Sequence, residues 1–354
     1  FTTKLNHDRQ MRKSIALIIT SILVLSGCNK QQSVSDRLLN EVEKAIAINP
    51  DSASNLLKSI SSPEKLDDKA FARWCMLSGK ITDEIFNSIL PTYQLERAYD
   101  WYSSHGSPDE QVQILIYLGC SYFADGDYDK AMSIYTNALD IAEKNKLNNL
   151  IGYTYDYIGD LYREKFMLTE AIKKYETAAE CFKKENNTDS YACALKNIGR
   201  EYACIDSLSC AIEILTIADS VAANTKDIEV TASINNALGN IYVMREEYDK
   251  AEKYFLKALS TGKEKMPDYV ALIDLYTTTD SIDKAKELLS KIPQDDPQYT
   301  CSINYLYYQI HNAERDYKEA LAYLEEYVDM VDSIVYADSP VSYTHLRAHE
   351  TCAD

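Results

Sequence analysis

The chain has 354 residues, 46% of them hydrophobic, so it can fill the cores of two ordinary domains or of one elongated array of repeats. Its formal net charge of −18 argues against direct nucleic-acid binding, because phosphate contacts need clustered Lys and Arg. Only 10 glycines and 8 prolines are present, and no proline occurs between Pro108 and Pro267. This composition predicts a largely helical chain and excludes a fold of many strands and turns.

The first 35 residues read as a targeting segment. Residues 11–27 begin with a methionine and a basic pair and continue through a short apolar stretch to small residues, an order typical of a secretory signal. The sequence LSGC, which ends at Cys28, resembles a bacterial lipobox and implies lipidation of that cysteine. We therefore expect residues 1–10 to precede the natural start, and residues 28–35 to form a tether.

This lipidation implies a location. Acyl chains on Cys28 would hold the protein on a membrane outside the cytoplasm through inserted hydrocarbon. Asn29 follows the cysteine, which in similar lipoproteins slightly favours the outer membrane over the inner one. We expect a membrane-anchored lipoprotein that faces the periplasm.

A unit of forty residues recurs four times in the middle of the chain. In the first unit, Gly119 is followed by Tyr122, Ala131, Tyr135 and Ala138. A glycine with a tyrosine three residues later puts a notch and a ring on one helical face, where a second helix can cross. The alanines allow the same close approach on the partner helix. Each unit is therefore predicted to be a helical hairpin, and the equivalent glycines are Gly159, Gly199 and Gly239.

These units resemble the tetratricopeptide repeat, whose Leu-Gly-x-x-Tyr pattern appears here as LGCSY, IGDLY, IGREY and LGNIY. The resemblance implies an all-α fold, an α-solenoid of stacked antiparallel helical hairpins. The period of forty instead of the usual 34 suggests that each helix is nearly a turn longer. We expect an irregular helical cap over residues 36–108, four repeats over 109–263, and two degenerate repeats over 264–339.

The last residues, 340–354, continue none of these patterns. The sequence VSYTHLRAHET over residues 341–351 matches the translation of an adapter used in preparing sequencing libraries. His345 and His349 therefore carry no inference about function. We expect the native sequence to be truncated near Ser339, within a helix.

The resemblance also implies a binding surface. In repeats of this family the first helices line a concave groove, and the positions three before and one after the glycine often contact ligand. In the first unit these positions are Ile116 and Cys120. From the later units we predict a protein- or peptide-binding surface, extended by two neighbouring side chains, that consists of Tyr153, Asp156, Asp160, Arg163, Lys196, Arg200, Asn236 and Asn240.

Within this surface the residue types suggest distinct roles. Lys196 and Arg200 suit a carboxylate or an acidic side chain. Asn236 and Asn240 suit the backbone of an extended peptide, because amides supply donor and acceptor together. The alternative is a solvated helix face, in which the aspartate pair forms salt bridges to the basic pair on the neighbouring helix.

Catalytic chemistry has little support in the sequence. Asp156 and Asp160 form a carboxylate pair, but no histidine or oxyanion donor is identifiable beside them. No P-loop, Gly-x-Ser-x-Gly or dinucleotide fingerprint occurs. The cysteines form no Cys-x-x-Cys pair, so we expect no zinc and free thiols, with a Cys204–Cys210 pairing left open. We predict a protein that is not an enzyme and needs no cofactor or metal.

Two acidic patterns have structural explanations. The series Asp125, Asp127 and Asp129 lacks the glycine and the closing glutamate of a calcium loop and suits an acidic turn. Asp206 and Asp280 each begin an Asp-Ser-apolar triplet, a pattern that carries O-linked glycans in some secreted bacterial proteins. Helix capping explains these two aspartates equally well.

The leading functional hypothesis is a lipid-anchored, extracytoplasmic tetratricopeptide scaffold that binds a protein or peptide in its groove without catalysis. The alternative is the periplasmic sensor part of a membrane signalling or transcriptional regulator whose transmembrane and cytoplasmic segments are lost after Ser339. The lipobox favours the scaffold, and a lost apolar span would favour the sensor.

Overall fold

The structure is a computed structural model that describes residues 35–46, 48–85, 89–225, 227–263, 265–294 and 299–338. The predicted signal segment, the lipidation site at Cys28 and the adapter-like residues 340–354 lie outside these ranges. Within them the secondary structure is helical and contains no strand. The predicted all-α fold is confirmed.

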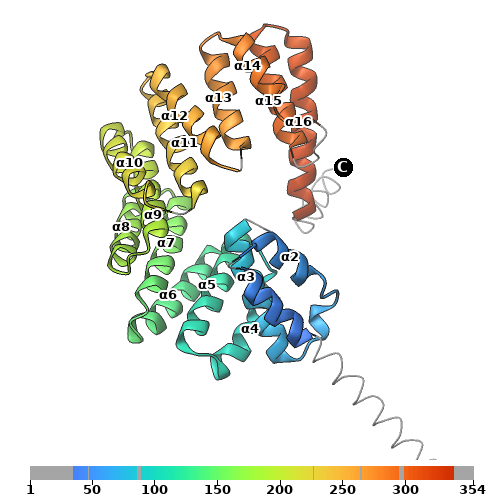
Figure 1. Ribbon diagram of the computed structural model, residues 1–354, viewed down its shortest axis with the longest axis vertical. Helices are drawn as coiled ribbons and strands as arrows, with labels where there is room; N and C mark the ends of the chain where they lie inside the picture. Colours follow the sequence, from blue (N-terminus) through green and yellow to red (C-terminus); the bar gives the residue numbers. More distant parts are fainter. Residues whose placement is uncertain are drawn as a thin grey trace, which may run out of the picture. The chain divides into compact units, whose positions relative to one another are not determined.

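The chain divides into two units, unit 1 ending at Lys165 and unit 2 beginning at Phe166, and each is described by itself. Unit 1 starts with a helix over residues 35–46, and its elements pack in chain order (Figure 1). They are α2 (Pro50–Lys58), the 3₁₀ turn η1 (Pro63–Lys65), α3 (Asp68–Ile85), α4 (Thr92–His105), α5 (Pro108–Ala124), α6 (Tyr128–Lys144) and α7 (Asn148–Glu164).

Unit 2 is a series of helical hairpins. Its helices are α8 (Leu168–Lys184), α9 (Thr188–Cys204), α10 (Leu208–Ala222), α11 (Ile228–Met244), α12 (Tyr248–Thr261), α13 (Met266–Thr278), α14 (Ile282–Leu289), α15 (Thr300–Ala313) and α16 (Tyr317–Asp338). From α9 onward each odd-numbered helix packs on the even-numbered helix that follows it. The odd-numbered helices α9, α11, α13 and α15 also contact one another in that order. This stacking is the predicted α-solenoid.

One turn geometry explains the forty-residue period. Helices α5 to α9 are 17 residues long and are joined by turns of three residues. The middle residue of each turn is left-handed, and the backbone closes with a bond typical of helix C-termini, such as Leu147 N–H to Ala142 O at 2.9 Å. This middle residue recurs every 20 positions, as Gly126, Lys146, Phe166, Asn186 and Asp206, and 40 positions after Asp206 it recurs as Glu246.

The same turns correct the interpretation of two aspartates. Asp206 (φ 60°) and Asp280 (φ 54°) occupy the left-handed position, so neither is a helix cap. The cap positions belong to the next residues, Ser207 and Ser281. The capping explanation of Asp206 and Asp280 was wrong because the pattern identified the turn but placed the helix start one residue too early. Asn and Asp are among the residues that tolerate this backbone conformation.

The glycine notches are filled from the partner helix. A Cβ atom on Gly119 would lie 2.2 Å from the ring of Tyr135, and one on Gly239 would lie 2.4 Å from the ring of Phe255. As expected, the ring of Tyr122, three residues after the glycine, packs beside the notch against the cluster that contains Ala131 and Tyr135. Its hydroxyl donates a hydrogen bond to Glu96. A bulky side chain of the second helix fills the notch in each of these hairpins, since Leu215 lies against Gly199 in the same way.

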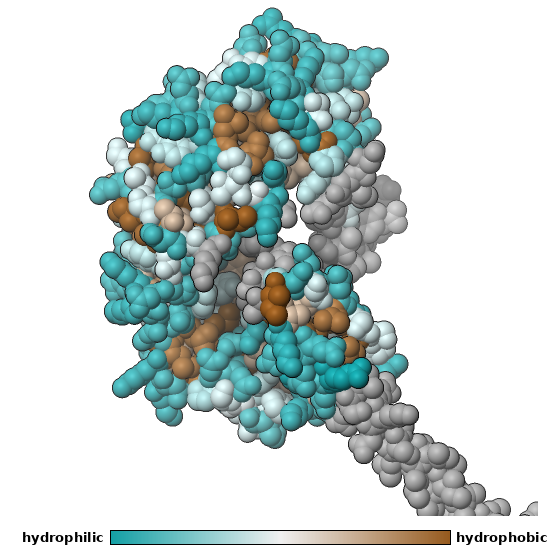
Figure 2. Space-filling model, viewed as in Figure 1, coloured by the Kyte–Doolittle hydropathy of each residue, from teal (hydrophilic) through white to brown (hydrophobic). Residues whose placement is uncertain are grey.

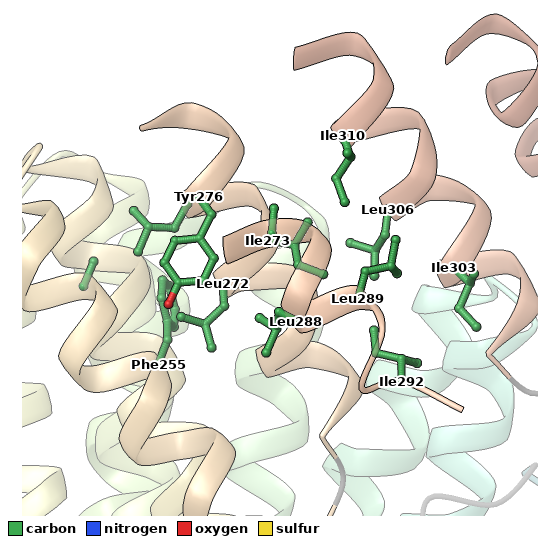
Figure 3. Packing of buried hydrophobic residues seen from close by; sticks show 13 residues of the cluster. Phe255, Leu272, Ile273, Tyr276, Leu288, Leu289, Ile292, Ile303, Leu306 and Ile310 are labelled. Atoms are coloured by element: carbon green, nitrogen blue, oxygen red, sulfur yellow. The ribbon is translucent and has the colours of Figure 1, made fainter. Parts of the chain in front are cut away.

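A core cluster of unit 2 joins α12, α13, α14 and α15 (Figure 3). Phe255 reaches from α12 toward Leu272 and Tyr276, and further along the cluster Leu289 meets Leu306. These side chains are at least 92% buried. Each Å² of apolar surface removed from water stabilises a fold by about 25 cal/mol. Burial of this cluster therefore stabilises the C-terminal hairpins even though their sequence pattern is degenerate.

A capping box begins α5, and its loss should weaken unit 1. The Ser107 hydroxyl accepts from Glu110 N–H at 3.3 Å, and Ser107 N–H donates to the Glu110 carboxylate at 2.9 Å. We expect Ser107→Ala to lower the free energy of unfolding by about 1 kcal/mol. Urea unfolding followed by tryptophan fluorescence measures this, because both tryptophans, Trp74 and Trp101, belong to unit 1.

The matched control is Ser104→Ala, at an exposed position in the last turn of α4. Alanine is the better helix former, so this variant should be as stable as the parent protein or slightly more stable. Equal losses in the two variants would contradict a capping role for Ser107.

Candidate functional site

The predicted residues of unit 1 lie on one side of α7. Tyr153 is 38% exposed, and Asp156, Asp160 and Arg163 are half-buried. The guanidinium of Arg163 pairs with Asp160 at 3.3 Å and with Glu164 at 3.7 Å. These ion pairs lie within one helix and are partly exposed, so each stabilises the fold by only a few tenths of a kcal/mol.

The position rule, which selects the residues three before and one after each repeat glycine, does not select surface residues in the first repeat. Ile116 is 4% exposed and belongs to the core of unit 1. Cys120 accepts a hydrogen bond from the Tyr135 hydroxyl at 3.4 Å. These two side chains are therefore part of the packing between helices.

On α9, Lys196 is half-buried and Arg200 is exposed. Neither side chain forms an ion pair within the described part of unit 2. The alternative interpretation predicts salt bridges from these side chains to Asp156 and Asp160 on α7. Such salt bridges would join the two units, and they stay a prediction. Lys196 and Arg200 give α9 a basic face.

Asn236 and Asn240 on α11 border a shallow depression of about 440 Å³. Its opposite side is formed by α13, and one residue of α15 completes it. In Figure 2 hydrophobic surface gathers over α13, amid a mostly hydrophilic face. The depression is of a size that holds small ligands or single side chains. Its lining consists of Asn236, Asn240, Met266, Pro267, Val270, Ala271, Asp274 and Ser302.

The two amides are held by hydrogen bonds within the protein. Asn236 Nδ2 donates to Asp268 Oδ1 at 2.7 Å, and Asn240 Nδ2 donates to Asn236 Oδ1 at 2.9 Å. Asp268 is 3% exposed, and its burial raises its pKa to about 6 although the Asn236 bond opposes this. We expected the amides to offer donor and acceptor equally. Because donors of both amides are used internally, the oxygen of Asn240 is the main group that they present.

Asp274 on α13 is the charged group of this depression. Its Oδ1 atom is buried and has no hydrogen-bond partner among the described residues. Burial raises the pKa of Asp274 to about 6, so the carboxylate is mostly ionised at neutral pH but poorly solvated. Its charge also contributes, after burial, to the raised pKa of Tyr305 on α15. The depression therefore contains a negative charge that no basic side chain of the described residues neutralises.

The sequence pattern missed Asp274 because its repeat lacks the glycine. Ile273 stands where Gly239 stands in the preceding repeat. The register can still be found from the turn, since the left-handed Asp280 follows Ile273 by seven positions, as the turn residue follows each repeat glycine. Counting back from it, the same position rule selects Val270 and Asp274, both of which line the depression.

Other kinds of site were sought in the described residues. These residues contain no group of three or more His, Cys, Asp or Glu side chains that could hold a metal ion. No helix among them is both long and apolar enough to cross a membrane. The seven cysteines of the described ranges are free thiols, including the exposed Cys204 and Cys210. Burial raises the pKa of the Cys75 thiol to about 12, so it is not a nucleophile at neutral pH.

Comparisons with known proteins agree with this architecture. Tetratricopeptide repeat families match residues 112–145 and residues 231–266. Among curated proteins, none matches the sequence. Among solved structures, the apo form of RapI is similar, with a TM-score of 0.57 and 14% identity over 89% of this chain and 93% of that chain. NprR in complex with its cognate peptide NprX gives 0.52 and 15% over 90% and 98%.

The apo form of the quorum sensor NprR from B. thuringiensis is also similar, with a TM-score of 0.52 and 14% identity over 89% of this chain and 98% of that chain. At these identities the likeness concerns the fold. Together with the two matched segments, it shows that the chain contains tetratricopeptide repeats within an α-solenoid of stacked antiparallel helical hairpins.

Proposed function

We propose that the protein is a lipid-anchored, extracytoplasmic scaffold that binds an extended segment of a protein or peptide along the first helices of its repeats, without catalysis. The observation that carries this proposal is the depression between α11 and α13, where Asn236, Asn240 and Asp274 meet apolar side chains. An apolar hollow with a few convergent polar groups is the usual form of a binding site.

The chemistry of the surrounding surface supports sequence-specific binding. Along unit 2 the groove positions change from a basic pair on α9 to amides on α11 and a carboxylate on α13, and these three helices contact one another in that order. A face that served only solubility would not need a buried, unpaired carboxylate oxygen. The fold itself suits a peptide, since the similar NprR structure contains a peptide bound to that protein.

The membrane anchor of this scaffold rests on the lipobox-like sequence before Cys28. Lipidation there would place the groove outside the cytoplasm, next to a membrane, where it would collect a protein or peptide partner. The acidic composition favours such partners over nucleic acid.

A second candidate is the sensor part of a membrane signalling or transcriptional regulator. The similar NprR is described as a quorum sensor, which favours this alternative. In both candidates the groove binds a segment of polypeptide, and they differ in whether binding is passed on to a further part of the protein.

A selection from a random phage-displayed peptide library on the immobilised protein tests the shared proposal. We expect enriched peptides whose affinity falls about tenfold or more in the variants Asn240→Ala and Lys196→Ala/Arg200→Ala, because each change removes hydrogen bonds to the ligand. Fluorescence anisotropy with a labelled synthetic copy of an enriched peptide measures the affinity.

The control is Lys253→Ala, on the exposed side of α12. Its affinity should equal that of the parent protein. Enriched peptides that bind all of these variants equally, or a selection that enriches none, would contradict the proposal.

A further inference from the structure

We propose that the depression between α11 and α13 receives an arginine or lysine side chain of the bound segment, and that the Asp274 carboxylate recognises its charge. The inference rests on the proposed function and specifies the ligand chemistry of the same surface. It identifies a specificity-determining residue that the repeat pattern did not reveal.

The shape of the depression fits a long side chain with a charged end. Its apolar wall is formed by side chains at the start of α13, and the carboxylate of Asp274 lies one to two helical turns further along the same face. Lys and Arg need this arrangement, because their methylene stems pack on apolar surface while the charged end needs a polar partner. The apolar wall consists of Met266, Pro267, Val270 and Ala271.

The hydrogen-bonding groups in the depression are mainly acceptors. The amide of Asn236 donates to Asp268, and the amide of Asn240 donates to Asn236. The Asn240 oxygen is left without a donor among the described residues. The Asp274 carboxylate accepts no hydrogen bond at Oδ1 within the same ranges. A guanidinium or ammonium group carries only donors, so it complements this lining, whereas a carboxylate ligand would be repelled.

The environment of Asp274 also opposes a purely structural role. Burial raises its pKa, and among the residues that the structure describes no basic side chain lies close enough to lower it. A poorly solvated, unpaired carboxylate destabilises a fold, and such local costs are typical of functional sites. A cation supplied by the ligand would neutralise the charge at the place where the protein leaves it unpaired.

The experiment compares two proteins and two peptides. The probe is a synthetic peptide enriched on the parent protein, together with a copy in which its arginine is replaced by citrulline, which is neutral and nearly isosteric. A lysine would be replaced by its acetylated form. We expect Asp274→Asn to weaken binding of the charged peptide about tenfold to a hundredfold, the usual effect of losing a charged hydrogen bond. The neutral peptide should bind both proteins within about threefold.

The matched control is Asp329→Asn, an exposed aspartate in the interior of α16. It removes the same charge from the protein without touching the depression, so both peptides should bind it as they bind the parent. Circular dichroism of each variant verifies folding.

The outcomes separate the two proposals. One outcome is a set of peptides whose affinity falls in Asn240→Ala but is the same for Asp274→Asn and the parent protein. This outcome would overturn the inference and leave the proposed function standing. Equal losses for the charged and the neutral peptide would overturn it as well. A selection that enriches no peptide would overturn both.

Discussion

Replacing Phe255 with alanine is expected to lower the free energy of unfolding of unit 2 by about 3–5 kcal/mol. The ring is 1% exposed and packs against the notch at Gly239. Its removal leaves a cavity at the start of the cluster that joins α12 to α15. Amide hydrogen exchange of α12, α13 and α14, followed by mass spectrometry, measures the loss as faster exchange.

Two controls accompany this variant. Leu256→Ala removes a neighbouring apolar side chain that is 45% exposed, so it should change the stability by no more than about 0.5 kcal/mol. Tryptophan fluorescence reports on unit 1, where both tryptophans lie, and gives that unit's own transition for comparison. Similar exchange in Phe255→Ala and Leu256→Ala would show that the ring does not hold the hairpin together.

The second large effect concerns the dependence of stability on pH. Asp274 has a pKa of about 6 in the folded protein against an ordinary value of 3.8. Between these values the folded chain keeps a proton that the unfolded chain has lost. The stabilisation from this residue is therefore complete below about pH 4 and is lost as the pH rises through about 6. Asp274→Asn removes the charge, so at pH 7 it should unfold with a free energy about 1–2 kcal/mol higher than the parent.

Urea unfolding of both proteins at a series of pH values between 3 and 8 measures this difference. It should be small at the acid end and constant above about pH 7, while Asp268, with a similar pKa, contributes equally to both proteins. Tyr305 faces the same region but titrates far above this range. Asp329→Asn should show no such trend. If Asp274→Asn were less stable than the parent at pH 7, this would contradict the interpretation that the Asp274 carboxylate is poorly solvated and unpaired.

Together with the binding experiment, this prediction gives Asp274→Asn an unusual combination of effects. The variant should be more stable at neutral pH and yet bind a cationic peptide less well. Most variants that lose binding through misfolding would show the opposite change in stability. The combination is characteristic of a residue kept for function at a cost to the fold.

The repeat architecture was predictable from the sequence because its determinants are local. The spacing from Gly119 to Tyr135 and Ala138 follows from the geometry of two helices in contact, so it recurs in the regular repeats. The degenerate hairpins from α13 onward were harder to place, because Ile273 fills the glycine position and the burial of Leu272 and Leu306 depends on neighbours far away in the chain.

The candidate site was predictable only in part. The position rule selected Asn236 and Asn240, which border the depression. It could not show that Asn236 is bound to Asp268, 32 positions later, since that bond depends on how α11 and α13 pack. Nor could it show that Oδ1 of Asp274 is buried, because burial is a property of the whole packing arrangement.

The uniform turn between helices has a consequence for how such a protein changes over time. The connections from α5 to α10, and those of α11–α12, α13–α14 and α15–α16, have three residues with a left-handed middle residue, which is glycine only at Gly126. A duplication or deletion of forty residues that begins and ends in these turns rejoins two identical connections and keeps every helix in phase. The number of repeats can therefore change by one repeat at a time without a change in the fold of each hairpin. The length of polypeptide that the groove can bind would change with it.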